Sequence, residues 1–281
     1  MKTILPIVAL LFLVSCGNNN DSELSDSSLK DSIAIDSVKP KVDEEKEFKL
    51  HLLIANIPSP SHEIIAINKA GYTYKSSLLI DKSKAGSYSS DFKKGINYGM
   101  FSADLAYVAS FANNKDIIPY YLATRKAAES ANALKIFDDI TKSANFETLQ
   151  GNSDSMEAVL ERAYLETEHF FETDHHMDIA TRILLGAWIE GQYLLLNTIH
   201  IQKSSKAEEL KNKVWESKLQ LMNLNELLTE YSSDPDMLSV ANSLKEYYKN
   251  YDGASGSKSF NDELLKKMME ELTSIRTKLL S

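Results

Sequence analysis

The chain is poor in cysteine, because Cys16 is the only one among its 281 residues. A single cysteine cannot form a disulfide within the chain. The folded part therefore has to take its stability from a packed core, and a chain of this length can bury a core of sufficient size.

Several sequence motifs that mark known enzyme classes are also absent. There is no Gly-x-Gly-x-x-Gly or Walker-type loop for nucleotides, no Gly-x-Ser-x-Gly nucleophile elbow and no His-Glu-x-x-His zinc motif. The two tryptophans give little support to an aromatic platform for sugars. The sequence predicts no cofactor.

Positive charge is scarce as well. The chain has 31 lysines and arginines against 40 acidic residues, a formal net charge of −9 and a pI near 5.3. Proteins that bind nucleic acid or anionic lipid surfaces present basic patches, so this balance argues against both partners.

Long hydrophobic runs are missing except at the start of the chain. Lys2 precedes an apolar run from Ile4 to Val14, which is followed by the small residue Ser15. The run is too short for a helix that remains across a bilayer, which needs about 20 apolar residues. A positive start, a short apolar core and small residues at the cut are typical of a secretory signal, so residues 1–15 are predicted to be removed.

The residues at this cut, Leu13-Val14-Ser15-Cys16, resemble the lipobox of bacterial lipoproteins. The resemblance implies cleavage before Cys16, lipidation of its sulfur and fatty acylation, such as palmitate, of the new amino terminus. Several acyl chains hold a protein firmly on a membrane. Gly17, in place of aspartate, implies the outer membrane, and Asp21 and Glu23 resemble surface-export signals of some Bacteroidota lipoproteins. The domain is thus expected to face the periplasm or the cell surface.

An acidic spacer follows the predicted anchor. Residues 17–47 contain nine acidic residues, four lysines and no aromatic residue. Such a segment cannot bury enough apolar surface to offset the entropy of ordering it. Residues 16–47 are therefore predicted to be the lipidated cysteine and a disordered tether.

The remainder, residues 48–281, is predicted to be one all-α globular domain, either a multi-helix bundle or stacked helical pairs. Apolar residues recur at helical spacing, with no long strand-like alternation. Asp234-Pro235 is a strong start signal, a cap followed by proline at the first helical position. The expected helices are 61–69, 91–112, 116–134, 137–144, 154–172, 174–199, 205–231, 235–251 and a last helix opened by 259–262.

The predicted helix that ends at Ile199 is apolar on almost all sides and is expected to be the central helix of the bundle. It places Glu190 between apolar residues, and a buried carboxylate must be paired, hydrogen-bonded or protonated. Arg182 lies two turns earlier, and Arg162 and Arg125 are alternative partners on other helices. Glu190 is either a binding or catalytic carboxylate or half of a structural ion pair.

Asp104 is a second unusual carboxylate, because it lies on the apolar face of its helix beside Tyr107. It is expected to accept a hydrogen bond from a core tyrosine or to cap another helix, unless it meets Glu190 to form an acid pair.

A weak candidate for a metal site lies in the segment Glu166-Thr-Glu-His169, with His175 and His176 shortly after it. Glu-x-x-His spacing places a carboxylate and an imidazole on one helix face in di-metal bundles. In those bundles the two motifs lie on separate helices, whereas here these residues are close together in the chain. The alternative is therefore a solvated acidic surface, and no metal is predicted.

Two blocks, Asn97–Tyr107 and Gly186–Tyr193, are similar to segments of uncharacterised all-helical lipoproteins of Bacteroidota. The resemblance implies location and fold, but no activity.

Three functional hypotheses follow. The first is a lipid-anchored, non-enzymatic module that binds an envelope protein or a small ligand. The second is a metal- or acid-dependent hydrolytic enzyme using Glu190, Asp104 and His169 or His176. The third is a purely structural envelope protein.

Overall fold

Helices and their connecting turns make up the part of the chain that is described by the computed structural model, namely residues 44–55, 57, 61–113, 115–143, 162, 177–202, 206–231 and 233–281. No strand occurs among these residues, which confirms the predicted all-α fold. The described residues all belong to one compact unit, Val42–Ser281.

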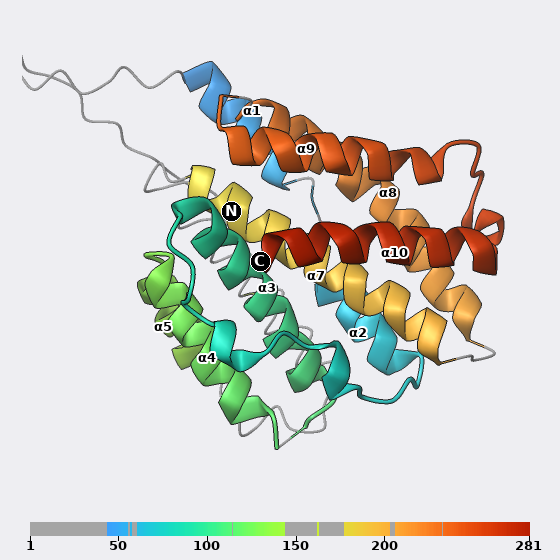
Figure 1. Ribbon diagram of the computed structural model, residues 1–281, viewed down its shortest axis with the longest axis horizontal. Coiled ribbons are helices and arrows are strands. Elements are labelled where there is room, and N and C mark those ends of the chain that lie inside the picture. The colour runs from blue at the N-terminus through green and yellow to red at the C-terminus, as the bar shows by residue number, and fades with distance from the viewer. Residues whose placement is uncertain are drawn as a thin grey trace, which may run out of the picture. The chain divides into compact units, whose positions relative to one another are not determined.

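The helices are labelled in chain order in Figure 1. They are α1 Glu44–Ala55, α2 Ser61–Lys69, α3 Asp91–Ser110, α4 Ile117–Ser130, α5 Leu134–Ser143, α7 Met177–Ile201, α8 Ala207–Thr229, α9 Pro235–Tyr248 and α10 Asp262–Leu279, with short 3-10 turns η1 Ser76–Leu78, η2 Lys82–Lys84, η3 Lys249–Tyr251 and η4 Ser257–Ser259.

Side-chain caps explain where several helices begin. The Asp234 side chain accepts hydrogen bonds from the first backbone N–H groups of α9, and Pro235 occupies the first helical position, as predicted. Ser90 caps α3 in the same way. Asn261, and not Ser259, caps α10 by accepting a hydrogen bond from the backbone of Leu264 at 2.8 Å.

Most predicted helix ends lie within three residues of the observed ones, and two differences are larger. Helix α1 begins at Glu44, inside the segment assigned to the tether, because acidic residues favour a helix amino end and Leu50 and Ile54 bury against the core. Helix α4 ends at Ser130 instead of residue 134, because Asn132 adopts a φ of 58° that no helix continues. The predicted helix 154–172 lies outside the described residues apart from Arg162.

Helix α7 is the centre of the bundle, as its composition predicted. It packs against α1, α2, α3, α8 and α10, with α4 and α5 beyond α3 on one side and α9 beyond α8 on the other (Figure 1). Its contact with α3 is backbone to backbone. A Cβ on Gly99 would meet the carbonyl oxygen of Ile183, and one on Gly186 would meet that of Ile96. The absence of a side chain at Gly99 and Gly186 therefore allows the two backbones to approach this closely.

Helix α10 closes the bundle over α7 (Figure 1). Its apolar residues Met268, Leu272, Ile275 and Leu279 are spaced along one face and are buried. The stripe fixes the orientation of α10, and this orientation brings Arg276 to the carboxylate of Glu190.

Candidate functional site

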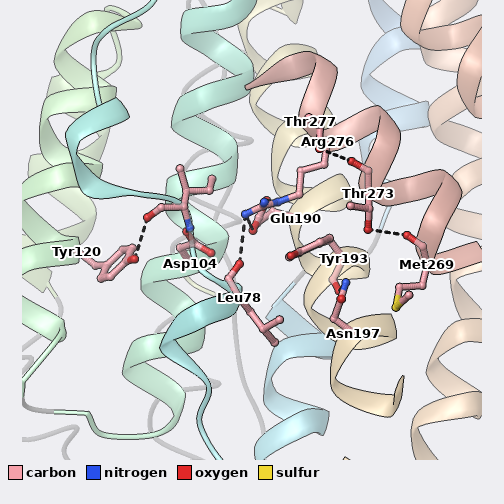
Figure 2. Close-up of polar contacts among 11 residues, drawn as sticks. Leu78, Asp104, Tyr120, Glu190, Tyr193, Asn197, Met269, Thr273, Arg276 and Thr277 are labelled. Atoms are coloured by element: carbon pink, nitrogen blue, oxygen red, sulfur yellow. Dashed lines mark hydrogen bonds and ion pairs between the residues drawn. The ribbon is translucent and has the colours of Figure 1, made fainter. Parts of the chain in front are cut away.

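The centre of the candidate site is an ion pair between α7 and α10. Arg276 Nε donates to Glu190 Oε2 at 2.6 Å, and Arg276 Nη2 donates to Glu190 Oε1 at 2.7 Å. The Glu190 side chain is 0% exposed and that of Arg276 is 12% exposed. The guanidinium also lies over the ring of Tyr193, with 4.0 Å between its carbon and the ring centroid. Figure 2 shows the pair with Tyr193 beside it. Two-point binding of this kind is the strongest arrangement for an arginine and a carboxylate.

Asp104 on α3 meets this pair from the other side, and it is also 0% exposed. Its Oδ2 accepts a hydrogen bond from the backbone N–H of Ile80 at 2.9 Å, and its carboxyl lies close enough to that of Glu190 for the two charges to act on each other. Tyr120 donates to the carbonyl oxygen of Ile80 at 2.8 Å, while Arg276 Nη2 donates to that of Leu78 at 3.3 Å (Figure 2). The acid pair left open by the sequence is therefore present.

The surroundings of the two carboxyls favour a proton on one of them. Burial, together with the neighbouring Glu190 charge, raises the pKa of Asp104 well above its usual range. Burial also raises the pKa of Glu190, against the charge and hydrogen bonds of Arg276, which lower it. Asp104 Oδ1 has no hydrogen-bond partner among the described residues. Of the two carboxyls, Asp104 is the one whose neutral form is favoured more, because Arg276 stabilises the charged form of Glu190.

The arginines expected beside Glu190 lie elsewhere. Arg182 forms ion pairs with Asp178 at 3.2 Å and Asp234 at 3.7 Å, so it links α7 to the start of α9. Arg125 pairs with Asp138 at 3.2 Å, and Arg162 is exposed. The prediction that one of these three approaches Glu190 was wrong.

Tyr107 belongs to a neighbouring aromatic cluster on the same helix as Asp104. Its hydroxyl accepts a hydrogen bond from the backbone N–H of Lys75 at 3.1 Å, and its ring stacks on Tyr74 at 5.4 Å between centroids. Tyr74 in turn donates to Asp116 at 2.8 Å. These contacts hold the segment before η1 against α3, so the position of Tyr107 is explained by packing.

Sequence reasoning missed a third buried carboxyl, that of Glu63 in the first turn of α2. Gln220 Nε2 donates to Glu63 Oε1 at 2.8 Å, and Gln220 Oε1 accepts from the Trp188 indole at 3.0 Å. Burial raises the pKa of Glu63 to about 7, against the Gln220 hydrogen bond that lowers it. The only signal in the sequence is that Glu63 precedes Ile64 and Ile65, which are both buried.

The remaining candidates, namely Cys16, Glu166, His169 and His176, lie outside the described residues. Within the described ranges, no group of three or more His, Cys, Asp or Glu side chains is placed to hold a metal ion. Among the same residues, no helix has the length and apolar character needed to span a membrane.

The acid cluster joins α3, α7, α10 and the segment 78–80, and three of its four carboxylate oxygens are hydrogen-bonded, the exception being Asp104 Oδ1. The cluster is a buried ion pair with a second buried carboxyl beside it. No family model, curated protein or solved structure matches the chain.

Proposed function

We propose that the protein is a lipid-anchored helical lipoprotein of the cell envelope, held in the outer membrane through Cys16, of the Bacteroidota type, whose helical domain binds a partner protein or a small ligand. The observation that carries the anchor is the sequence Leu13-Val14-Ser15-Cys16, which ends in the only cysteine of the chain. The following Gly17 supports the outer membrane, with the domain facing the periplasm or the cell surface.

The arrangement of the buried carboxyls supports binding over catalysis. A hydrolytic enzyme working through Asp104 and Glu190 would need at least one of them to reach a substrate. Both side chains are buried, Glu190 is bound at both oxygens by Arg276, and Asp104 is bound by the backbone of Ile80. We therefore assign this cluster to the stability of the domain and expect ligands to bind at its outer faces.

Metabolic labelling tests the anchor. Cells expressing the full chain are fed an alkyne-bearing palmitate analogue, and the protein is examined for the label and for its membrane fraction. We expect a labelled protein in the outer membrane fraction, and loss of both label and membrane association in Cys16→Ser. Ser25→Ala, a matched change in the tether, should keep both. Label retained in Cys16→Ser would refute the lipoprotein assignment.

A further inference from the structure

A groove of about 470 Å³ lies on the surface where the start of α2, the outer face of α8 and the end of α9 meet. Trp215, Lys218, Leu219 and Met222 line it from α8, and Tyr248 lines it from α9. Sites for small molecules commonly have volumes of about 300–1,000 Å³ and combine apolar walls with a few polar groups. The groove is separate from the acid cluster, which involves none of these residues.

The walls of the groove are apolar and open to solvent. Leu219 is 57% exposed and Met222 is 46% exposed, although both are large hydrophobic residues. Together with Trp215 they are spaced at helical intervals, so they follow one face of α8. An apolar molecule placed on this face would remove that surface from water, which is favourable.

A single unbalanced positive charge lies in the same groove. The Lys218 ammonium sits 5.2 Å from the ring centroid of Trp215 and 5.9 Å from that of Tyr248. It makes no ion pair with a carboxylate within the described part of the chain, whereas neighbouring Lys213 binds Glu216 at 2.7 Å. The two rings hold the Lys218 charge beside the apolar walls.

The inner wall of the groove carries little negative charge that would repel an anion. Glu63 lines it from α2, and burial raises the pKa of this carboxyl to about 7, so at neutral pH it carries only part of a negative charge. Its Oε2 has no hydrogen-bond partner among the described residues. Lys213 and Glu216 also line the groove, but their opposite charges form an ion pair at 2.7 Å, which leaves Lys218 as the lysine of the groove without an ion pair among the described residues.

We propose that this groove binds a small amphiphilic carboxylate, with the apolar body of the ligand on Trp215, Leu219 and Met222 and its carboxylate at the Lys218 ammonium. The inference rests on the binding part of the proposed function and names the ligand class for it. It is independent of the anchor, because no groove residue belongs to the segment 1–47.

Calorimetric titration with sodium octanoate tests the proposal, using the full lipidated chain in nanodiscs and empty nanodiscs as the reference. Octanol and octylammonium, which keep the chain and remove or reverse the charge, are the matched probes. We expect octanoate to bind with a stoichiometry of one and to bind more tightly than either. Lys218→Gln should weaken octanoate binding by about two- to fivefold, the effect of one ion pair near a surface, and leave octanol binding unchanged.

Two further variants keep the result interpretable. Lys245→Gln changes an exposed lysine on α9 outside the groove and should not alter binding. Leu219→Asp, at an exposed position where folding is not at risk, should abolish octanoate binding while the thermal melt is unchanged.

Three results would overturn the proposal: no octanoate binding, equal binding of octanoate and octylammonium, or an unchanged affinity in Lys218→Gln. Sedimentation that shows a dimer dissociated by Leu219→Asp would assign the groove to a second copy instead. Any of these results together with a lipidated Cys16 would leave the anchor in place and reject only the ligand.

Discussion

The guanidinium of Arg276 on α10 binds both carboxylate oxygens of Glu190 on α7, 86 residues earlier in the chain. Both side chains are largely removed from water, so each depends on the other for compensation of its charge. Through this pair the last helix is joined to the central one by a polar contact as well as by its apolar stripe.

Arg276→Met tests the importance of this pair. The change leaves Glu190 buried without its cation, and breaking one side of a buried pair costs about 3–5 kcal/mol. We expect the free energy of unfolding, measured in urea, to fall by that amount. Arg125→Met, which breaks the more exposed pair with Asp138, should cost less than about 1 kcal/mol. Equal losses in the two variants would contradict the buried character of the Glu190 pair.

Substitutions of Asp104 test where the proton lies. Because burial favours the neutral form of Asp104, Asp104→Asn should keep the hydrogen bond from Ile80 and change stability by less than about 1 kcal/mol at neutral pH. Asp104→Leu removes the acceptor of that bond and should cost about 1–3 kcal/mol.

The pH dependence gives a second measure of the same proton. The pKa of Asp104 is raised on folding, so its contribution to stability is complete below the unfolded pKa near 4 and is lost as the pH rises towards the folded pKa. Asp104→Asn should therefore lose less stability than the native chain on moving to alkaline pH. A steeper loss in the variant would show that Asp104 is ionised in the fold.

For Glu63, the pH range over which the stability of the fold changes can be stated. Its pKa rises from 4.5 to about 7 on folding, so the folded state is favoured at low pH and loses on the order of 3 kcal/mol of stability between pH 4.5 and 7. Glu63→Gln should flatten the stability curve in this window. Glu246→Gln, on the exposed side of α9, is the control and should leave the curve unchanged.

The close glycine contact between α3 and α7 predicts an exception to the usual stabilising effect of replacing a helix glycine by alanine. Replacing a glycine inside a helix by alanine ordinarily stabilises it by about 0.5–1 kcal/mol. Gly99→Ala would instead place a methyl group on the Ile183 carbonyl, and we expect a loss of about 2 kcal/mol or more because α3 and α7 must separate. Thermal melts that show a gain for Gly99→Ala would contradict the close contact.

Much of the fold was predictable because its signals are local. The apolar stripe of α10, the Asp234-Pro235 start of α9 and the apolar composition of α7 each depend on residues close together in the chain. The same reasoning selected Asp104 and Glu190, because a carboxylate among apolar neighbours is conspicuous in any sequence. Their burial is confirmed.

The partner of Glu190 was not predictable in the same way. Arg276 lies four residues after Leu272 and three before Leu279, so it adjoins the buried stripe, but the stripe does not reveal which helix it meets. Arg182 was the expected partner because it is on the same helix as Glu190, but it forms an ion pair with Asp178, one turn before it. Pairings between distant helices depend on how the helices dock, which one sequence does not record.

The short segment between η1 and η2 has a consequence for hydrogen exchange. Ile80 lies outside any helix, but its N–H donates a hydrogen bond to Asp104 and its carbonyl oxygen accepts one from Tyr120. Arg276 donates a hydrogen bond to the nearby carbonyl oxygen of Leu78. Loop amides normally exchange with deuterium through small local openings. The Ile80 amide can exchange only when contacts from α3, α4 and α10 are released together, so it should exchange as slowly as the core of the central helix and report the unfolding of the whole domain.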